Sequence, residues 1–359
     1  MTRNTMIPVM RPKLPTLDQI RPHIEEINAS RIYSNSGPIL NRVRGEYAKY
    51  LGVPIENIVP VANATLALQG ALEILTQQNW IVPDYTFSAT AHAAISAKKS
   101  IKFSDVSTSN FQLLIPTSLE RYNFGALPVL PFGAPIEFEA WFGFDSLVID
   151  AAASLGAPPP NFNKMPHNSI VVYSLHATKV LGAGEGALVI CENSKIAKKL
   201  RAWSNFGFES ARISNILGTN AKMSEYSAAV ALASILDFEN ERDEWLASLS
   251  KIANTYIPER YRTIVDQYPG FRPYWIIQTS DFDEKKSLEK YLFDRGVETR
   301  SWWGTRISDM PAFSKVEKLM DTINAKELVE THLGLPIWRG ITSTEVEKIG
   351  ELICNFELQ

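Results

Sequence analysis

The sequence contains little cysteine, no long apolar run and no excess of charge of either sign. Its two cysteines, Cys191 and Cys354, belong to no CxxC pair and to no cluster with metal-ligand spacing, which fits a reducing cytoplasm. No apolar run approaches the roughly 18 residues of a membrane-spanning helix, and the opening MTRNTMIPVMRP lacks the apolar core of a secretory signal. We therefore expect a cytoplasmic protein without a membrane segment.

The charges are balanced, with 36 basic and 39 acidic residues and a formal net charge of -3. This balance provides no extended basic field for nucleic acid, so we expect a small or locally recognised ligand. The five histidines include no HExxH motif and the carboxylates show no metal spacing, so no metal is expected. A GxGxxG or Walker phosphate loop is also missing, which argues against a nicotinamide enzyme.

Short apolar runs alternate with segments of helical period from about residue 40 to 235. This alternation predicts an α/β domain with a largely parallel sheet of seven strands. The predicted strands are 57–61, 80–82, 101–103, 126–130, 146–149, 169–173 and 186–190. A helix over 16–29 is expected to pack outside this sheet.

The second part of the chain predicts a smaller α+β domain. Residues 223–256 have helical apolar spacing and then become strongly charged, as in one long helix that leads out of the first domain. After it we expect a strand, a helix, a strand and a helix over 271–280, 287–296, 297–303 and 343–356. The predicted domains are residues 1–240 and 241–359.

Ligands in parallel α/β sheets bind beyond the carboxyl ends of strands, so the residues that follow each predicted strand are the first candidates. Asn63, Ala64 and Thr65 open a helix after 57–61, where free backbone N–H groups and a hydroxyl suit a phosphate, although plain N-capping explains them too. Phe87 follows the strand at 80–82 and could cover a planar ring, whereas a core or helix-start role is the simpler explanation.

Two further strands end in polar residues. Asp150 follows 146–149, and a carboxylate at the end of a buried strand needs a cation or several donors unless it only caps a turn. Ser174, His176 and Lys179 follow 169–173 in a turn with small neighbours. A lysine in a dry cleft or near other cations can form a Schiff base, although glycine-rich hairpins with a solvated lysine are common.

Taken together, these strand ends match the requirements of one cofactor. Pyridoxal 5'-phosphate needs helix amides and hydroxyls for its phosphate, a carboxylate for its ring nitrogen, an aromatic face for its ring and an amine for its aldehyde. The four positions supply one of each. The combination therefore predicts a pyridoxal-phosphate enzyme.

Motifs in a fixed order extend over nearly the whole chain. They are IPVMRP (7–12), YSNSGP (33–38), ANATLAL (62–68), IVPDYTFSATAHA (81–93), VIDAAASLGA (148–157), YSLHATKVLGAGEGA (173–187), WSNFGF (203–208), GTNAKMSE (218–225) and LPIWRGITSTEVEKI (335–349). In order and spacing they resemble the nucleotide-sugar aminotransferases of the DegT/StrS group. The resemblance implies the aspartate-aminotransferase fold (fold type I).

The resemblance also implies roles for single residues. Lys179 corresponds to the lysine that holds the cofactor covalently, and Asp150 to the partner of its ring nitrogen. Phe87 resembles the aromatic that stacks on the ring. The implied phosphate contacts are Ala64, Thr65, Ser174 and Asn220.

Asn220 resembles an asparagine that reaches the phosphate of the neighbouring subunit, which implies a homodimer with shared active sites. Lys222 lies where the family often has a basic residue near the same site. The chain departs from the family pattern at Ala153, where glutamine or histidine usually lies next to the phenolic oxygen of the cofactor, and at Ala64, where glycine is usual.

The segments GTNAKMSEYSAAVALAS and ETRSWWGTRISDMPAF (298–313) are most similar to enzymes that aminate C4 of dTDP-4-keto-6-deoxyglucose with L-glutamate, for O-antigen sugars of the viosamine type. The alternatives are amination of a 3-keto sugar, a sugar dehydratase of the same fold, which would replace Lys179 with histidine, and a non-catalytic sensor.

Four residues of the second segment are candidates for substrate contact. Trp302 and Trp303 could flank the sugar or nucleotide, unless they pack at a domain seam. Arg300 and Arg306 could meet the diphosphate, unless they lie on an exposed loop.

Overall fold

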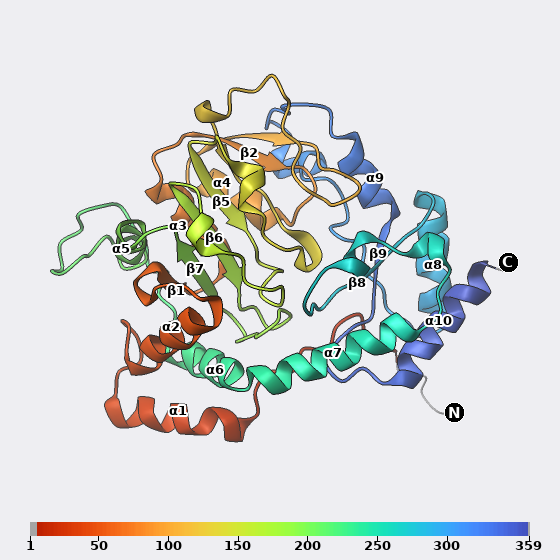
Figure 1. Ribbon diagram of the computed structural model, residues 1–359, viewed down its shortest axis with the longest axis horizontal. Helices are drawn as coiled ribbons and strands as arrows, with labels where there is room; N and C mark the ends of the chain where they lie inside the picture. The colour runs from red at the N-terminus through yellow and green to blue at the C-terminus, as the bar shows by residue number, and fades with distance from the viewer. Residues whose placement is uncertain (1–5, 358–359) are drawn as a thin grey trace.

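The computed structural model describes residues 6–357, and its first half is built around one sheet of seven strands (Figure 1). The strands are β1 (Ile58–Val61), β2 (Asn79–Pro83), β3 (Ser100–Ser104), β4 (Gly125–Ala126), β5 (Ser146–Asp150), β6 (Ser169–Ser174) and β7 (Ala187–Cys191). Their order is β1-β7-β6-β5-β4-β2-β3, and only β7 runs antiparallel to its neighbours. The predicted α/β fold with a mostly parallel seven-stranded sheet is confirmed.

The strand predicted over 126–130 is the least accurate of the seven. Regular pairing in β4 stops at Ala126. Pro128 has no N–H to donate to a ladder, although its carbonyl still accepts from the Asp150 N–H at 2.9 Å. Proline therefore shortens this central strand.

Alternate residues of the strands face two separate hydrophobic cores, as the period of two requires. In β5, Leu147 and Ile149 join the core beneath α2 and α6, whereas Val148 joins the core beneath α3, α4 and α5. The sheet is thus covered by helices on both faces. These helices are α2 (Pro38–Leu51), α3 (Ala64–Ile74), α4 (Ser88–Ser96), α5 (Ser194–Trp203) and α6 (Glu225–Leu236).

Helix α1 (Leu17–Ser30) lies below α2 and α6, away from the sheet (Figure 1). Thr16 and Gln19 form a capping box at its start, in which each side chain accepts a hydrogen bond from the other residue's backbone N–H. The helix expected over 16–29 is confirmed, and so is its position outside the sheet.

Helix α7 (Phe238–Asn254) connects the large sheet to a smaller C-terminal unit, as Figure 1 shows. The single helix predicted over 223–256 is wrong, because α6 ends at Leu236 and a new helix starts two residues later. Asp237 leaves helical geometry at the junction, and its carboxylate accepts a 2.6 Å hydrogen bond from the Asn240 amide. The domain boundary expected near residue 240 falls in the first turn of α7 and stays a prediction.

The smaller unit contains the two-stranded sheet of β8 (Trp275–Gln278) and β9 (His332–Leu335), which pair antiparallel. Its helices are α8 (Phe282–Asp294), α9 (Ile323–Thr331) and α10 (Ser343–Glu357). The strand predicted over 297–303 is wrong. Val297 bridges to Ile7 and Arg300 to Gly334, so the segment touches two partners and forms no continuous ladder.

Among residues 6–357, no helix combines the length and the apolar character needed to cross a membrane.

Candidate active site

The predicted strand-end residues meet at one edge of the sheet. Strands β1 and β6 both run antiparallel to β7, so they point the same way, and β2 and β5 are parallel to β6 through the ladder. The carboxyl ends of these four strands therefore lie on one side, where ligands of such sheets bind. Helices α3 and α4 begin at this edge, so their free N–H groups face it.

Asp150, the last residue of β5, is the buried acid of the site, with 6% of its surface exposed. Its Oδ2 accepts a 2.7 Å hydrogen bond from the Thr90 hydroxyl, and its Oδ1 accepts one of 3.2 Å from the Ala152 N–H. Burial raises the pKa of Asp150, while these two donors and the positive charge of Lys179 oppose the rise. A cationic group bound next to this carboxylate would compensate for the hydration that it loses on burial.

Thr90 was not among the predicted residues; it is the third residue of α4, three residues after Phe87. Its hydroxyl also lies 2.9 Å from that of Thr86, which makes a short chain of hydroxyls under Asp150. Phe87 precedes the helix and is exposed, whereas Thr90 is fully buried, so no shared helix face connected the two residues in the sequence.

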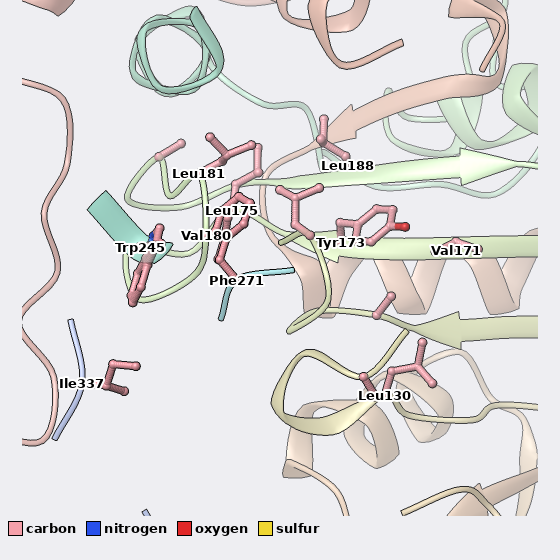
Figure 2. Close-up of a cluster of buried hydrophobic side chains, with 14 of the residues drawn as sticks. Leu130, Val171, Tyr173, Leu175, Val180, Leu181, Leu188, Trp245, Phe271 and Ile337 are labelled. Carbon is pink, nitrogen blue, oxygen red and sulfur yellow. The ribbon is translucent and has the colours of Figure 1, made fainter. Parts of the chain in front are cut away.

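Lys179 lies in the turn between β6 and β7, and apolar residues on both sides anchor this turn. Figure 2 shows Leu175, Val180 and Leu181 of the turn close to Phe271 and Trp245, which come from the C-terminal part of the chain. The Lys179 N–H donates to the His176 carbonyl at 2.8 Å. The buried neighbours hold the backbone, while the lysine side chain stays half-buried.

The Lys179 Nζ donates a 2.7 Å hydrogen bond to the hydroxyl of Tyr274, immediately before β8. No sequence signal pointed to Tyr274, because it lies 95 residues away, next to a strand of the smaller sheet. Its ring joins an aromatic cluster with Tyr85, Phe132, Trp302 and Trp303, where centroids lie 4.8 to 6.4 Å apart in the contacting pairs.

The predicted phosphate contacts lie at the start of helix α3 and at the end of strand β6. The Asn63 side chain caps α3 by accepting from the Leu66 N–H at 2.9 Å, which leaves the next residues, Ala64 and Thr65, at the open helix start. Thr65 is exposed there. Ser174 is buried, and its hydroxyl accepts from the His176 N–H at 3.2 Å. N-capping and phosphate binding are thus compatible at this helix.

Phe87, the residue before α4, is 59% exposed, which is unusual for an aromatic at a helix start that would pack in a core. The core explanation is therefore wrong for Phe87, and its ring is available to a ligand. Ala153 lies in the loop after Asp150. It packs against the aromatic cluster that contains Trp302 and Trp303.

The four predicted substrate residues of the 298–313 segment differ in their surroundings. Trp302 and Trp303 are half-buried in the aromatic cluster, so packing at the seam between the two sheets accounts for much of their surface. Arg300 is exposed, with its guanidinium 5.2 Å from the Trp302 ring.

The guanidinium of Arg306 is already engaged within the protein. It makes two bonds to the Asp309 carboxylate, of 2.7 and 2.9 Å, and a third to the Thr322 carbonyl at 3.2 Å. The paired carboxylate raises the pKa of Arg306. This arginine stabilises its own loop.

Asn220 and Lys222 lie between α5 and α6, beside the outer edge of β1, where Lys222 bridges to Val61. Asn220 is exposed. The Lys222 Nζ donates to the Asn205 side chain at 3.0 Å and lies 4.7 Å from the Phe206 ring. Burial lowers the pKa of Lys222.

The sequence pattern of the DegT/DnrJ/EryC1/StrS aminotransferase family matches residues 17–354. The chain is 26% identical to a dTDP-4-amino-4,6-dideoxy-D-glucose transaminase of Shigella dysenteriae over 95% of this chain and 96% of that protein. It is 25% identical to a dTDP-3-amino-3,4,6-trideoxy-alpha-D-glucose transaminase of Streptomyces venezuelae over 84% and 85% of the two chains.

Solved structures agree with the architecture described above. The structure of DesI in the presence of its TDP-sugar product superimposes with a TM-score of 0.83 at 23% identity, over 99% of this chain and 95% of that one. At this identity the match shows the shared fold.

Proposed function

Because the chain belongs to the DegT/DnrJ/EryC1/StrS aminotransferase family and is a pyridoxal-phosphate-dependent aminotransferase, we propose that it moves the amino group of L-glutamate to a nucleotide-linked keto-sugar. The proposed acceptor is dTDP-4-keto-6-deoxyglucose, aminated at C4. The observation that supports this acceptor most is the similarity to the Shigella transaminase over nearly the full length of both chains.

The residues at the sheet edge fit pyridoxal phosphate. A buried carboxylate with two protein donors suits a ring nitrogen that carries a proton, and a half-buried amine follows the next strand. The exposed ring of Phe87 and the open start of α3 complete the set. When bound, the cofactor supplies an aldehyde that carries the amino group and a ring that accepts electrons.

In the proposed mechanism, Lys179 would hold the cofactor between turnovers, and its freed Nζ would move a proton at the substrate carbon. Asp150 would hold the protonated ring nitrogen, with Thr90 as its support. The phosphate would bind to Ala64, Thr65 and Ser174.

We further propose that two copies of the chain share their active sites. Asn220 is exposed at the edge of the sheet, and in the proposed homodimer it reaches the phosphate site of the partner subunit. Lys222 would lie close to the same site. The exposed position of Asn220, next to the edge strand β1 of the sheet, supports this arrangement.

For the sugar nucleotide, we propose that Arg300 meets the diphosphate and that Trp302 and Trp303 form one wall of the sugar site. Arg300 is exposed and contacts no carboxylate within residues 6–357, whereas Arg306 is occupied by Asp309. We propose a cytoplasmic location and a role in O-antigen sugar synthesis, since the acceptor is a nucleotide-activated deoxysugar.

The acceptor is tested with a panel of dTDP-, UDP- and GDP-linked 3-keto and 4-keto sugars, incubated with L-glutamate and read by mass and NMR of the amino sugar. We expect amination of dTDP-4-keto-6-deoxyglucose at C4. Amination of only a 3-keto sugar would refute the C4 assignment and favour the second candidate, which the similarity to the Streptomyces transaminase supports.

The role of Lys179 is tested by Lys179→Ala, which should abolish steady transamination and covalent attachment of the cofactor. The control is Lys164→Ala, which breaks an exposed ion pair with Glu139 on a distant loop and should leave activity unchanged. Steady turnover by Lys179→Ala would show that another group does the chemistry.

A further inference from the structure

Tyr274 is the residue of the C-terminal unit that contacts the proposed reactive amine. It is 5% exposed, and its hydroxyl oxygen lies 2.7 Å from the Lys179 Nζ. The lysine belongs to the turn after β6 of the large sheet, while Tyr274 directly precedes β8 of the small sheet. The hydrogen bond therefore joins the two parts of the chain at the centre of the site.

The ring of Tyr274 is fixed by its neighbours. The Phe132 ring lies 5.7 Å away at an interplanar angle of 67°, and the Trp302 ring lies 5.5 Å away at the same angle. The next residue starts β8, which pairs with β9. The hydroxyl is thus held in place by packing on several sides. The lysine amine, in contrast, lies at the end of a flexible four-carbon side chain.

The aromatic cluster does not need its hydroxyl groups for packing. Tyr85, which is 2% exposed in the same cluster, has a buried hydroxyl without a hydrogen-bond partner among the described residues. A phenylalanine would fill the same space. The hydroxyl of Tyr274 differs because it is aimed at a single group, the Lys179 amine.

We propose that Tyr274 is a positioning residue for Lys179, which holds the amine at one place whenever it is not attached to the cofactor. A phenol oxygen accepts a hydrogen bond from an ammonium, and its O–H donates to a neutral amine, so the contact persists in both protonation states of the lysine. The amine is thereby kept within reach of the reacting carbon instead of sampling many rotamers. This inference rests on the proposed role of Lys179.

The same contact links the lysine to the position of the C-terminal unit. Because Tyr274 and Trp302 both belong to that unit, the amine is in its working place only when the two parts of the chain are packed as seen here. Loss of the hydroxyl should therefore affect the turnover step and leave substrate binding nearly unchanged.

The test compares Tyr274→Phe with Tyr85→Phe, which removes an unpartnered hydroxyl from the same cluster. In the cofactor-free protein, the rate of capture of pyridoxal phosphate is followed by absorbance. We expect capture to slow about tenfold in Tyr274→Phe, kcat to fall about 10- to 100-fold, and KM for L-glutamate to stay within about threefold. Tyr85→Phe should match the wild type in all three measurements.

Equal behaviour of the two variants would overturn the proposal. So would a much lower melting temperature of Tyr274→Phe than of Tyr85→Phe, because the hydroxyl would then serve packing and not the lysine. The wild-type protein separates this inference from the proposed function. If the wild type captures the cofactor and transaminates while both variants match it, only the role of Tyr274 fails.

Discussion

Replacing Thr90 with valine removes one hydroxyl from beneath Asp150 and keeps the branched shape of the side chain. In the native protein, that hydroxyl donates at 2.7 Å to the Oδ2 atom of a carboxylate with 6% of its surface exposed. The valine leaves the Ala152 N–H, at 3.2 Å, as the remaining hydrogen-bond donor recorded for this carboxylate among the described residues. The substitution therefore isolates one stabilising contact of the ionised acid.

A hydrogen bond to a charged group contributes about 1.5–3 kcal/mol. If Asp150 must be ionised to hold the protonated ring nitrogen, Thr90→Val should weaken binding of pyridoxal phosphate by about 10- to 100-fold, because about 1.4 kcal/mol corresponds to a factor of ten. Thr90→Ser is the matched control, since it keeps the hydroxyl and loses only a methyl group.

The effect on stability depends on pH in a direction that the structure defines. Burial raises the pKa of Asp150 above its ordinary value of 3.8, so the folded protein keeps this proton over a range in which the unfolded chain has lost it. That contribution to stability is present at low pH and is lost as the pH rises through the pKa that Asp150 has in the folded protein. Thr90→Val raises this pKa further, so the variant should lose more stability between low and high pH.

The assay is urea unfolding of the cofactor-free protein at several pH values, together with titration of pyridoxal phosphate by fluorescence. We expect Thr90→Val to have a lower free energy of unfolding than Thr90→Ser. This difference should be larger at about pH 8 than at about pH 5. Equal cofactor affinity of the two variants, or a difference in stability that does not change with pH, would refute the assigned role of Thr90.

Two further substitutions test the packing that holds the site together. The buried Asp84 carboxylate accepts three hydrogen bonds of 2.6 to 2.7 Å from the 308–322 segment, so Asp84→Ala should cost about 3 kcal/mol or more in urea unfolding, and a loss below about 1 kcal/mol would contradict this. A methyl group at Gly70 would lie 2.5 Å from the Trp203 ring, so Gly70→Ala should destabilise by about 1–3 kcal/mol. Gly45→Ala is the control, because its nearest contact would be 3.9 Å away and alanine favours the helix; equal melting temperatures of the two variants would count against the packing argument.

Much of the large sheet and of the site edge could be predicted because both depend on local patterns. Apolar runs of strand length indicated all seven strands, and the direction of parallel strands placed Asp150 and Lys179 at a common edge. The small unit was harder. Strand β9 is four residues long and includes Gly334, so neither its length nor its composition distinguished it from a turn.

The break between α6 and α7 was missed for a similar reason. Residues on both sides of Asp237 follow helical spacing, and one aspartate, although a weak helix former, does not by itself end a helix. The bend depends on what the two helices pack against, since α6 is buried beneath the sheet while α7 extends to the other unit.

The sequence by itself determined the seven strands of the large sheet and the chemistry at their ends, because strand period and helix starts depend on neighbouring residues. Only the tertiary structure decided which distant groups complete the site. Thr90 reaches Asp150 across 60 residues, and Tyr274 reaches Lys179 across 95. The first contact arises from packing of α4 on the large sheet and the second from packing of the small unit against it, and a single hydroxyl leaves no periodic pattern that would indicate its partner.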